Sequence, residues 1–337
     1  PHMKFICAFF SEIIFDTFVN KIINCGHEFS VDGDYCYFVV DEMGLIAKEK
    51  TIEIEESNPL GRLIDLDVYN EKSFTRQDVS CEMRTCLICE NYAHNCTRNQ
   101  THSKEELFAK IQEIIEDFLT SYMTNVTIQA IFSELELFPK FGLVSHRDNG
   151  CHKDMDYETF IHSAFAIKKY ISRYIREGFS NDLDPIKLQQ IGLRAEKKMF
   201  EATNNINTHK GLIFLLGIFL PALTKTIIHN EDHNFLKDRI KHYSTVIVGN
   251  YYETIETKET LSNADKIYLK HGVKGIRHEA LEGLELIFSV PSHSDLLVED
   301  RYHEYLIHIM SKLNDTTIIH RTNYETLQQV HTDMKTI

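Results

Sequence analysis

Apolar residues recur at helical spacing through most of the chain after Lys104, whereas only short β-like runs precede that point. Within 104–119 the side chains at 107, 111, 114, 115 and 118 are apolar, so they share one helical face. Ser103 and Glu106 have the spacing of a capping box at the start of this helix. The change of pattern predicts two domains, a small α+β domain and then, from near residue 121, a mostly all-α domain.

Periodicity also assigns elements within each part. In the first part we expect a helix over Phe15–Cys25 and strands over Tyr35–Val40, Thr51–Glu55 and Arg62–Tyr69. In the second part helical spacing predicts helices over 125–136, 157–177, 186–204, 208–228, 261–271 and 303–313. Pro1-His2-Met3 resemble residues added for expression and are set aside, so the predicted domains are 4–121 and 122–337.

Charge and cysteine content narrow the partners and the compartment. The formal net charge of -14 argues against nucleic acid as the main ligand. The apolar run Gly211–Leu223 is shorter than the roughly 20 residues of a membrane span, so it predicts a buried helix. Phe5–Phe10 is too short for a signal peptide, and the Cys86-x-x-Cys89 pair suggests reduced or metal-bound thiols. We therefore expect a cytoplasmic protein without a membrane partner.

Two carboxylates stand two positions apart in Gly61-Arg-Leu-Ile-Asp-Leu-Asp-Val68. On a strand, this spacing places Asp65 and Asp67 on one face and the apolar side chains between them on the other. Such a pair suits Mg²⁺, which also binds substrate phosphate oxygens, and Arg62 is suited to a phosphate. The alternative is an edge strand that carries two solvated acids.

A cysteine-rich segment follows, with the compact spacing Cys-x2-Cys-x6-Cys-x5-His. Four of its side chains are of the types that bind zinc: Cys86, Cys89, Cys96 and His102. The spacing is not that of a standard zinc finger, and buried thiols beside a surface histidine are the alternative. Arg84 and Arg98 flank the turn and suggest phosphate ligands.

These motifs together resemble a known family. Pro59-Leu-Gly-Arg-Leu-Ile-Asp-Leu-Asp-Val68 and Arg84-x-Cys-Leu-Ile-Cys89, with Thr101-His102, are similar to the holo-citrate lyase synthase family over about residues 20–119. That family transfers phosphoribosyl-dephospho-CoA to a serine of the citrate lyase acyl carrier subunit and releases pyrophosphate. The resemblance implies a nucleotidyltransferase-like domain, the acyl carrier subunit as partner, and these functional residues: Arg62, Asp65, Asp67, Arg84, Cys86, Cys89, Arg98 and His102.

Polar clusters at the starts of predicted helices mark the second domain. Asp156 has the position of a cap, and Asn207 and Thr208 can cap the apolar helix that follows them. A helix amino terminus offers free N–H groups that suit phosphate, while Lys210 adds charge and Gly211 permits close approach. Each residue alone has a structural explanation as a cap or a solvated side chain. Together they predict a nucleotide-phosphate site.

The second domain resembles another family. The motifs that carry the resemblance are Pro139-Lys-x-Gly-Leu-Val144, Gly150-x-His-Lys-Asp-Met155, Asn207-Thr-His-Lys-Gly211, Gly275-x-Arg277-x-Glu279 and Asp315-Thr316. From about residue 125 to the end, the chain is similar to the triphosphoribosyl-dephospho-CoA synthase family. That family joins ATP to dephospho-CoA and releases adenine.

The resemblance implies roles for particular residues. We expect Lys153, His209 and Lys210 to hold phosphates. We expect Asp154, Glu196 and Asp315 to bind Mg²⁺ or to serve as the base, with His209 also in the catalytic set, and Arg277 to offset transition-state charge. The other expected substrate-binding residues are Lys140, His152, Asn207, Thr208, Gly211 and Glu279.

Departures from the family patterns leave alternatives open. The first family's early Pro-Gly-Pro-x-Lys stretch corresponds here to Phe10–Ile14, which lacks lysine. In the second family's motifs, Phe141, Ser145, Asn205 and Thr317 replace the usual residues. One alternative is therefore a synthase whose transferase domain has decayed. The others are a catalytically impaired binder of CoA-like nucleotides and a helical metal-dependent phosphohydrolase.

Overall fold

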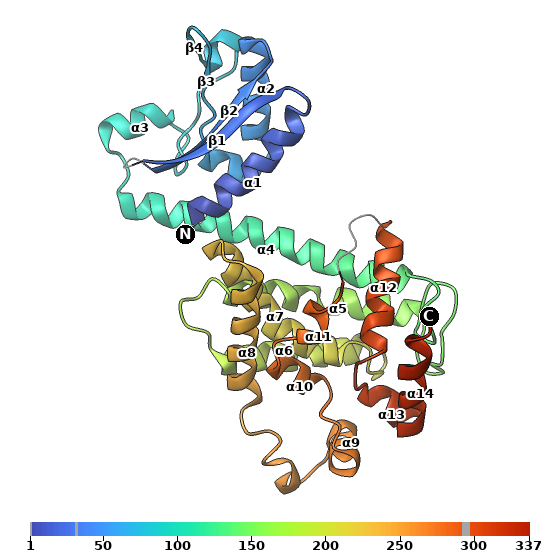
Figure 1. Cartoon of the computed structure of the whole chain (residues 1–337). Helices are drawn as coiled ribbons and strands as arrows, with labels where there is room; N and C mark the ends of the chain where they lie inside the picture. The colour runs from blue at the N-terminus through green and yellow to red at the C-terminus, as the bar shows by residue number, and fades with distance from the viewer. Residues whose placement is uncertain (1, 31–32, 292–296) are drawn as a thin grey trace. The chain divides into compact units, whose positions relative to one another are not determined.

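The computed structural model describes residues 2–30, 33–291 and 297–337, and the chain divides into two compact units. The first unit comprises Pro1–Ser121 with Ile227–Asn230, and the second comprises Tyr122–Thr226 with Glu231–Ile337. The division between Ser121 and Tyr122 falls inside one helix, α4 (Figure 1). Each unit has its own elements and its own buried residues, so each is described separately.

The first unit combines helices with two small antiparallel sheets. Its elements are α1 (His2–Thr17), β1 (Ile22–Ser30), β2 (Gly33–Val40), α2 (Gly44–Ser57), β3 (Val68–Tyr69), β4 (Ser73–Phe74), α3 (Ala93–Asn99) and the first part of α4 (Lys104–Glu136). Strand β1 pairs with β2, and β3 pairs with β4. Two short 3₁₀ helices, Pro59–Leu63 and Arg76–Val79, complete it.

The core of this unit forms along one stripe of α1. Ile6, Phe10, Ile14 and Phe18 are buried and stand four residues apart, so they lie on the same helical face. This face packs against β2 and α2. The expected strand over Tyr35–Val40 is confirmed as part of β2, and the hairpin and helices together form a small α+β unit.

Three expectations for this unit were wrong. Phe15–Cys25 is not one helix, because α1 ends at Thr17, Asn20 adopts a positive φ of 64°, and β1 begins at Ile22. Thr51–Glu55 lies in α2 and not in a strand. Within Arg62–Tyr69 only Val68 and Tyr69 form a strand, because a 3₁₀ helix reaches Leu63 and the segment between is irregular.

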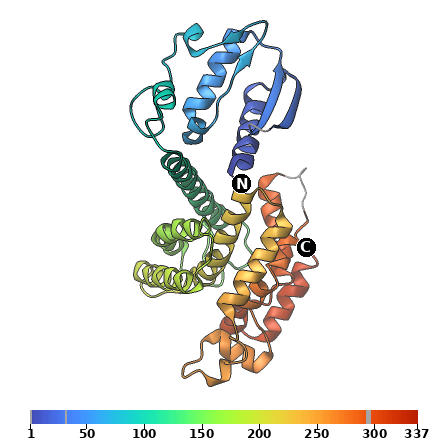
Figure 2. The same cartoon turned by 90° about the vertical axis from the view of Figure 1, so that its left-hand side faces the viewer.

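The second unit is helical throughout its described residues. After the end of α4 it contains α5 (Tyr157–Glu177), α6 (Pro185–Ala202), α7 (Lys210–His229), α8 (His233–Val248), α9 (Asn263–His271), α10 (Ile276–Leu281), α11 (Glu285–Phe288), α12 (Val298–Met310), α13 (Thr316–Arg321) and α14 (Tyr324–Met334). In Figure 2 the described residues of this unit are drawn as helices and loops, without a strand arrow. The prediction of a mostly helical second part is confirmed.

The predicted helix bounds differ from those in the structure mainly where buried apolar residues continue past a predicted helix end. Helices expected over 104–119 and 125–136 are one helix, α4, because buried Ile115, Leu119 and Met123 carry the stripe through the gap between them. The Ser103–Glu106 capping box is present, with Ser103 N donating to Glu106 Oε2 at 2.8 Å. The expected helix over 157–177 matches α5, whereas α8 was missed.

The apolar helix α7 is long and hydrophobic enough to meet the length and composition of a membrane span, although more than half of its apolar window is buried. Its apolar side chains have partners within the unit. Ile218 and Ala222 pack with Leu236 and Ile240 of α8 and with Ala280 of α10 in one core cluster. The expectation of a buried helix over this run is confirmed, and this packing accounts for its composition.

Candidate functional site

The segment that carries Asp65 and Asp67 is fixed through its backbone. Lys48 Nζ of α2 donates to Leu66 O at 2.9 Å, and Leu66 N donates to Glu55 Oε1 at 2.8 Å. Arg84 Nη1 donates to Ile64 O at 2.6 Å. These contacts hold positions 64 and 66 against the unit, while Asp65 and Asp67, which alternate with them, are exposed.

Glu55 is the centre of this support. Its side chain is 3% exposed and forms ion pairs with Arg76 at 2.8 Å and Arg84 at 2.7 Å. A buried carboxylate is tolerated only where opposite charges and hydrogen bonds compensate for lost solvation. Sequence reasoning missed Glu55, because nothing in the run Ile52-Glu-Ile-Glu55 distinguishes a buried glutamate from an exposed one.

Asp65 and Asp67 line a cavity of about 820 Å³. Its other walls come from α1, β2 and the start of α2, and Glu42 adds a third carboxylate. Carboxylate oxygens are the ligands that Mg²⁺ prefers in proteins. The two acids do not stand on a strand as expected, but both line this cavity.

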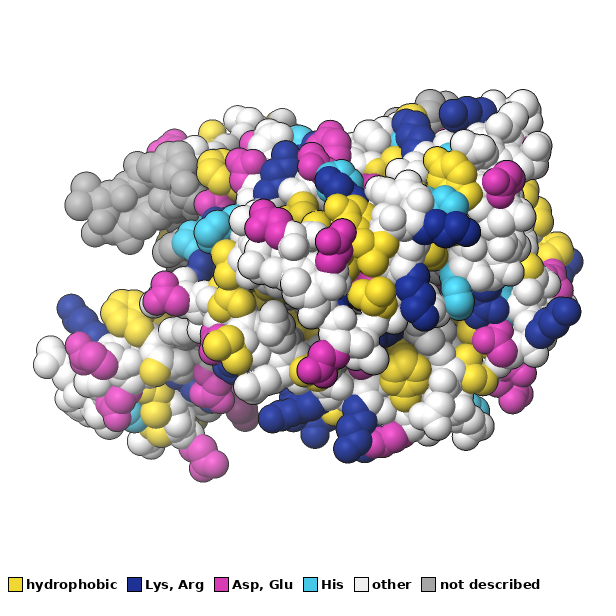
Figure 3. Space-filling model, turned by 90° about the horizontal axis from the view of Figure 1, so that it is seen from below, with side chains coloured by type: hydrophobic (Ala, Val, Ile, Leu, Met, Phe, Trp, Pro, Cys, Tyr) yellow, Lys and Arg dark blue, Asp and Glu magenta, His cyan; other side chains and the backbone are white. Residues whose placement is uncertain are grey.

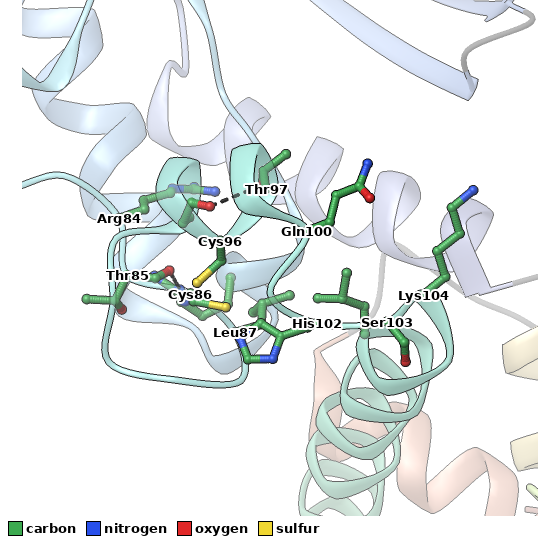
Figure 4. A pocket seen from close by; sticks show the side chains of 13 residues that line it. Arg84, Thr85, Cys86, Leu87, Cys96, Thr97, Gln100, His102, Ser103 and Lys104 are labelled. Atoms are coloured by element: carbon green, nitrogen blue, oxygen red, sulfur yellow. Dashed lines mark hydrogen bonds between the residues drawn. The ribbon is translucent and has the colours of Figure 1, made fainter.

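Arg62 and Arg84 line a different cavity of about 580 Å³ (Figure 4). Their guanidinium groups are already engaged, since Arg62 Nη2 donates to Thr85 O and Arg84 contacts Ile64 O and Glu55. The predicted arginine and aspartate ligands are therefore divided between two cavities. Arg98 is exposed on α3 and lines neither of these two cavities.

The cysteine cluster forms part of the wall of this second cavity. Ligand atoms of Cys86, Cys89, Cys96 and His102 all lie within 4.8 Å of one another. In Figure 4 the sulfur atoms of Cys86 and Cys96 and the ring of His102 point toward one another. Three thiols and one imidazole in this arrangement are compatible with zinc.

The protonation of the cysteines differs within the cluster. The pKa of Cys89 is lowered, first by a hydrogen bond from the backbone of Asn91 and then by the side chains of His102 and Cys96. The pKa of Cys96 is raised, chiefly because the thiol is buried. Cys89 is therefore the thiol that loses its proton more readily.

In the second unit, a chain of hydrogen bonds joins α5 to the start of α7. Thr208 Oγ1 donates to Ser163 Oγ at 2.7 Å, and Ser163 Oγ lies 2.6 Å from His209 Nδ1. A Ser163 hydroxyl that accepts from Thr208 has its own proton available for Nδ1. In the tautomer that matches this direction, the His209 proton is on Nε2.

Burial keeps His209 neutral. The residue is 7% exposed, Phe160 packs edge-on against its ring, and the loss of solvation lowers the pKa of His209 to about 4. An imidazole that is neutral near pH 7 is a hydrogen-bond donor through Nε2 and not a phosphate-binding cation. Burial therefore favours a role for His209 as a neutral hydrogen-bonding group.

Glu196 of α6 and Lys210 of α7 form an ion pair beside this chain. Lys210 Nζ lies 2.9 Å from Glu196 Oε2, and both side chains keep some exposure to solvent. Lys210 N donates to the side-chain oxygen Oδ1 of Asn207 at 3.3 Å. No heavy atom would meet a Cβ at Gly211 within 4 Å, so the backbone there borders open space.

The loop before α5 carries the other polar cluster. Asp154 accepts two hydrogen bonds from Arg321, at 3.0 and 3.2 Å, and this arginine lowers the pKa of Asp154. The pKa of His152 is lowered by burial and by Arg321, whereas Asp154 and Asp315 oppose that shift. The Asp315 carboxylate also caps α13 by accepting from Thr317 N at 2.6 Å. Arg321 was missed because nothing in the sequence around it is distinctive.

Lys140 and Lys153 have different surroundings. Lys140 is 4% exposed, donates to Val144 O at 2.7 Å and pairs with Glu134 at 2.6 Å. Lys153 is exposed. Only the second lysine has an ammonium group facing solvent, where a phosphate has access.

Arg277 and Glu279 begin α10. The Arg277 guanidinium lies 4.2 Å from the centroid of the Tyr251 ring, a cation–π contact, and burial raises the pKa of Glu279. Gly275 has a φ of 64°, and a Cβ there would lie 2.9 Å from Thr316 Cγ2. This close approach brings the start of α10 next to the Asp315 cap.

Hydrophobic packing joins the polar loop to the start of α7. Leu135, Val144 and Met155 form a core cluster against which Phe160 and Ile206 pack. Met155 follows Asp154, and Ile206 precedes Asn207. On the face in Figure 3, basic and acidic side chains are interspersed among apolar ones. Anionic ligands here would depend on local cations rather than on a broad positive surface.

Two carboxylates in a cavity of one unit, and polar clusters at helix starts in the other, are features of enzymes that transfer phosphorylated groups. Comparisons with known families agree. Residues 7–118 match the family of apo-citrate lyase phosphoribosyl-dephospho-CoA transferase, and residues 120–337 match that of ATP:dephospho-CoA triphosphoribosyl transferase. The class is therefore a pair of transferases in one chain.

Proteins of similar sequence occur in several bacteria. Protein CitXG of Haemophilus influenzae is 31% identical over 90% of this chain and 69% of its own length. Protein CitXG of Leuconostoc mesenteroides is 29% identical over 89% of this chain and 70% of its own length. A 2-(5''-triphosphoribosyl)-3'-dephosphocoenzyme-A synthase of Haemophilus ducreyi is 28% identical over 72% of this chain and 82% of its own length. The chain belongs to the family of fused CitX and CitG proteins, which confirms both resemblances.

Proposed function

We propose that residues 122–337 make 2'-(5''-triphosphoribosyl)-3'-dephospho-CoA and that residues 4–121 attach it to a serine of the citrate lyase acyl carrier subunit. The observation that carries this proposal is the match of both transferase families, in order, along nearly the whole chain. The eight free cysteines fit a reducing compartment, so we propose a cytoplasmic location. We further propose that nucleic acid and membrane are not partners, since the net charge is -14.

In the synthase step, the ribose 2'-hydroxyl of dephospho-CoA attacks the anomeric carbon of the ATP ribose. The carbon–nitrogen bond to adenine breaks, and the base leaves with a proton. We assign the proton acceptance to Glu196, whose carboxylate lies at the edge of the cluster. Neutral His209 donates through Nε2, while Lys210 and Lys153 contact the triphosphate.

The remaining residues of the second unit support this assignment in different ways. Lys140 positions the loop through Glu134 and Val144. Asp154 and Asp315, which both lie near His152, are the proposed carboxylate ligands of Mg²⁺. The Arg277 guanidinium lies 5.7 Å from the ring centroid of Phe214 in α7. We assign Arg277 and Glu279 to substrate binding, together with the helix-start residues Asn207, Thr208 and Gly211.

In the transferase step, the carrier serine attacks the α-phosphorus and the bond to pyrophosphate breaks. We propose that the first unit has a nucleotidyltransferase-like site in which Asp65 and Asp67 hold Mg²⁺, since both carboxylates line one cavity. The ion supplies charge neutralisation for the leaving pyrophosphate. The cysteine cluster is a separate site, and its thiols favour Zn²⁺ over Mg²⁺.

Adenine release is the direct test of the synthase step. The full chain is mixed with ATP, Mg²⁺ and dephospho-CoA, and the products are separated by chromatography and weighed by mass spectrometry. Adenine together with triphosphoribosyl-dephospho-CoA is the expected result. Well-folded protein that binds the nucleotides without releasing adenine would instead identify a binding protein, and phosphate release would identify a phosphohydrolase.

A second candidate is a synthase whose first unit no longer transfers. The observation in its favour is the composition of the 820 Å³ cavity, where none of the described lining residues is a lysine or arginine. The wall formed by α1 and the turn after it is mainly apolar, with Ile6, Phe10, Ile14 and Phe18. Apo-carrier subunit added to the same reaction separates the candidates. A mass increase of the carrier supports transfer, whereas adenine without carrier labelling supports the synthase alone.

A further inference from the structure

The distances within the cysteine cluster match a metal site better than other sulfur chemistry. Cys89 Sγ lies 3.5 Å from Cys96 Sγ, and His102 Nε2 lies 3.3 Å from Cys89 Sγ. Tetrahedral zinc with bonds of about 2.3 Å to sulfur has sulfur–sulfur edges of about 3.8 Å. A disulfide requires about 2.05 Å between the sulfur atoms. The observed spacing is therefore close to that around a shared ion.

The backbone around the first two cysteines has the form of a metal-binding turn. Thr85 and Tyr92 form an antiparallel bridge, and Cys86 N donates to Asn91 O at 2.7 Å. Within the turn, Ile88 N lies 3.4 Å from Cys86 Sγ and donates to it. Such N–H groups stabilise thiolate charge and orient the sulfur atoms of a metal site.

Hydrophobic burial does not explain why this segment is folded. Within Cys81–Ser103, all of which the structure describes, Cys96 is the only buried residue. Yet the segment contains a tight turn, the helix α3 and the capped start of α4. Segments too small to form a core are usually held by disulfides or by a structural metal.

We propose that Cys86, Cys89, Cys96 and His102 bind one Zn²⁺ as a closed structural site that holds the wall of the 580 Å³ cavity in place. Three thiolates and a neutral imidazole give the bound ion an overall charge of about -1, which is a poor partner for phosphate. Four protein ligands also leave no open position for a substrate. The ion thus maintains the shape of this wall and does not take part in either transfer reaction, so the inference goes beyond the proposed function.

Metal analysis of the full chain tests this inference. The chain is purified without added metal or an affinity tag that binds metal, and zinc is measured by elemental mass spectrometry. Wild-type protein should hold about one Zn²⁺ per chain. Cys89→Ser should hold little or none. Cys81→Ser is the matched control, because Cys81 lies in the same unit but outside the cluster, and this variant should keep its zinc.

Cobalt gives a second reading if Cys89→Ser fails to fold. Wild-type protein stripped by a chelator and titrated with Co²⁺ should show the sulfur-to-cobalt charge-transfer bands of a tetrahedral thiolate site, saturating at one ion per chain. Folded wild-type protein that binds neither ion would overturn the proposal. So would a Cys89–Cys96 disulfide found by mass spectrometry, or zinc retained in Cys89→Ser. These readings need no substrate, so they stand apart from the tests of adenine release and carrier labelling.

Discussion

At the scale of single residues, one hydroxyl determines what His209 can do. Ser163 directs its proton to His209 Nδ1, so the ring presents Nε2–H. A hydrogen bond that fixes the tautomer of a histidine affects the rate without touching the substrate. Ser163 is therefore a positioning residue in the proposed synthase reaction.

Ser163→Ala should lower the turnover number for adenine release by about 10- to 100-fold, as for other hydrogen bonds that orient a histidine. The Michaelis constant for ATP should change much less, and the ¹⁵N shifts of His209 should show a mixture of tautomers. Ser172→Ala on the same helix is the control, because its hydroxyl bonds only to Lys169 O in the described contacts. Equal effects of the two substitutions would refute the positioning role.

The buried histidine also makes stability depend on pH. The pKa of His209 is about 4 in the folded chain, below its ordinary value of 6.5, so the unfolded chain binds the proton more readily. Its contribution is fully present above pH 6.5, falls as the pH drops and levels off below pH 4. The total loss is on the order of 3 kcal/mol. Thermal unfolding from pH 7 to 4 should show a steeper decline for wild-type protein than for His209→Gln.

Sequence motifs selected Asn207, His209 and Lys210 as candidates but gave no sign of their protonation states or partners. In the structure Lys210 Nζ pairs with Glu196, and Lys210 N donates to Asn207 Oδ1. The neutral form of His209 could not be predicted, because burial lowers its pKa and its ring contacts residues far back in the chain, such as Ser163, 46 positions earlier. Partners that distant leave no local pattern.

At the scale of elements, α2 shows why the spacing of apolar residues can predict the wrong secondary structure. Its buried residues at 47, 48, 51, 52, 54 and 55 follow helical spacing, but half of them are polar or charged. Only Ile52 and Ile54 are strongly apolar after residue 47, and those two alternate as in a strand. The pattern of apolar residues therefore did not reveal the helix, because two of its buried positions are the charged residues Lys48 and Glu55. Both are hydrogen-bonded to the backbone of Leu66. In α5 the buried residues are nearly all apolar, and the prediction matched.

The contact between α2 and the following 3₁₀ helix depends on a glycine. A Cβ at Gly61 would lie 2.1 Å from Glu55 O, so Gly61→Ala must displace backbone. We expect the free energy of unfolding of the first unit to fall by roughly 1–3 kcal/mol. Calorimetry of the variant and the wild-type chain would measure the change.

Gly211→Ala should behave in the opposite way. Its Cβ would meet no heavy atom within 4 Å, and alanine favours the first turn of α7 by up to about 1 kcal/mol. If a phosphate approaches this backbone, the variant should be at least as stable as wild type while releasing adenine more slowly. Unchanged kinetics would exclude Gly211 from the proposed substrate site.

At the scale of the whole molecule, the two proposed reactions should be separable. Asp65→Asn should abolish carrier labelling and spare adenine release, because Asp65 lines a cavity formed only by residues 6–70. Glu196→Gln should lower adenine release by about 100-fold or more. Given preformed triphosphoribosyl-dephospho-CoA, the second variant should still label the carrier. Loss of both activities in either single variant would contradict two independent sites.

The overall plan was more predictable than the small unit. Long helices such as α5 and α7 can be predicted from the sequence, because apolar residues recur at helical spacing over many turns. The first unit depends on two-residue strands, 3₁₀ helices and a cysteine-rich turn, whose conformations are set by tertiary contacts. Its candidate site residues stood out as motifs, whereas the conformation of the segments that carry them could not be predicted.

Intolerance of substitution is often taken as the mark of a reactive residue, and Glu55 shows how that inference fails. This side chain is hidden from solvent, yet it holds Leu66, Arg76 and Arg84 in place. A saturation mutagenesis survey scored by growth on citrate would rank position 55 beside Asp65. Such a survey would include a supporting residue in the apparent active site, because loss of growth does not distinguish a residue that holds the site in place from one that touches the substrate.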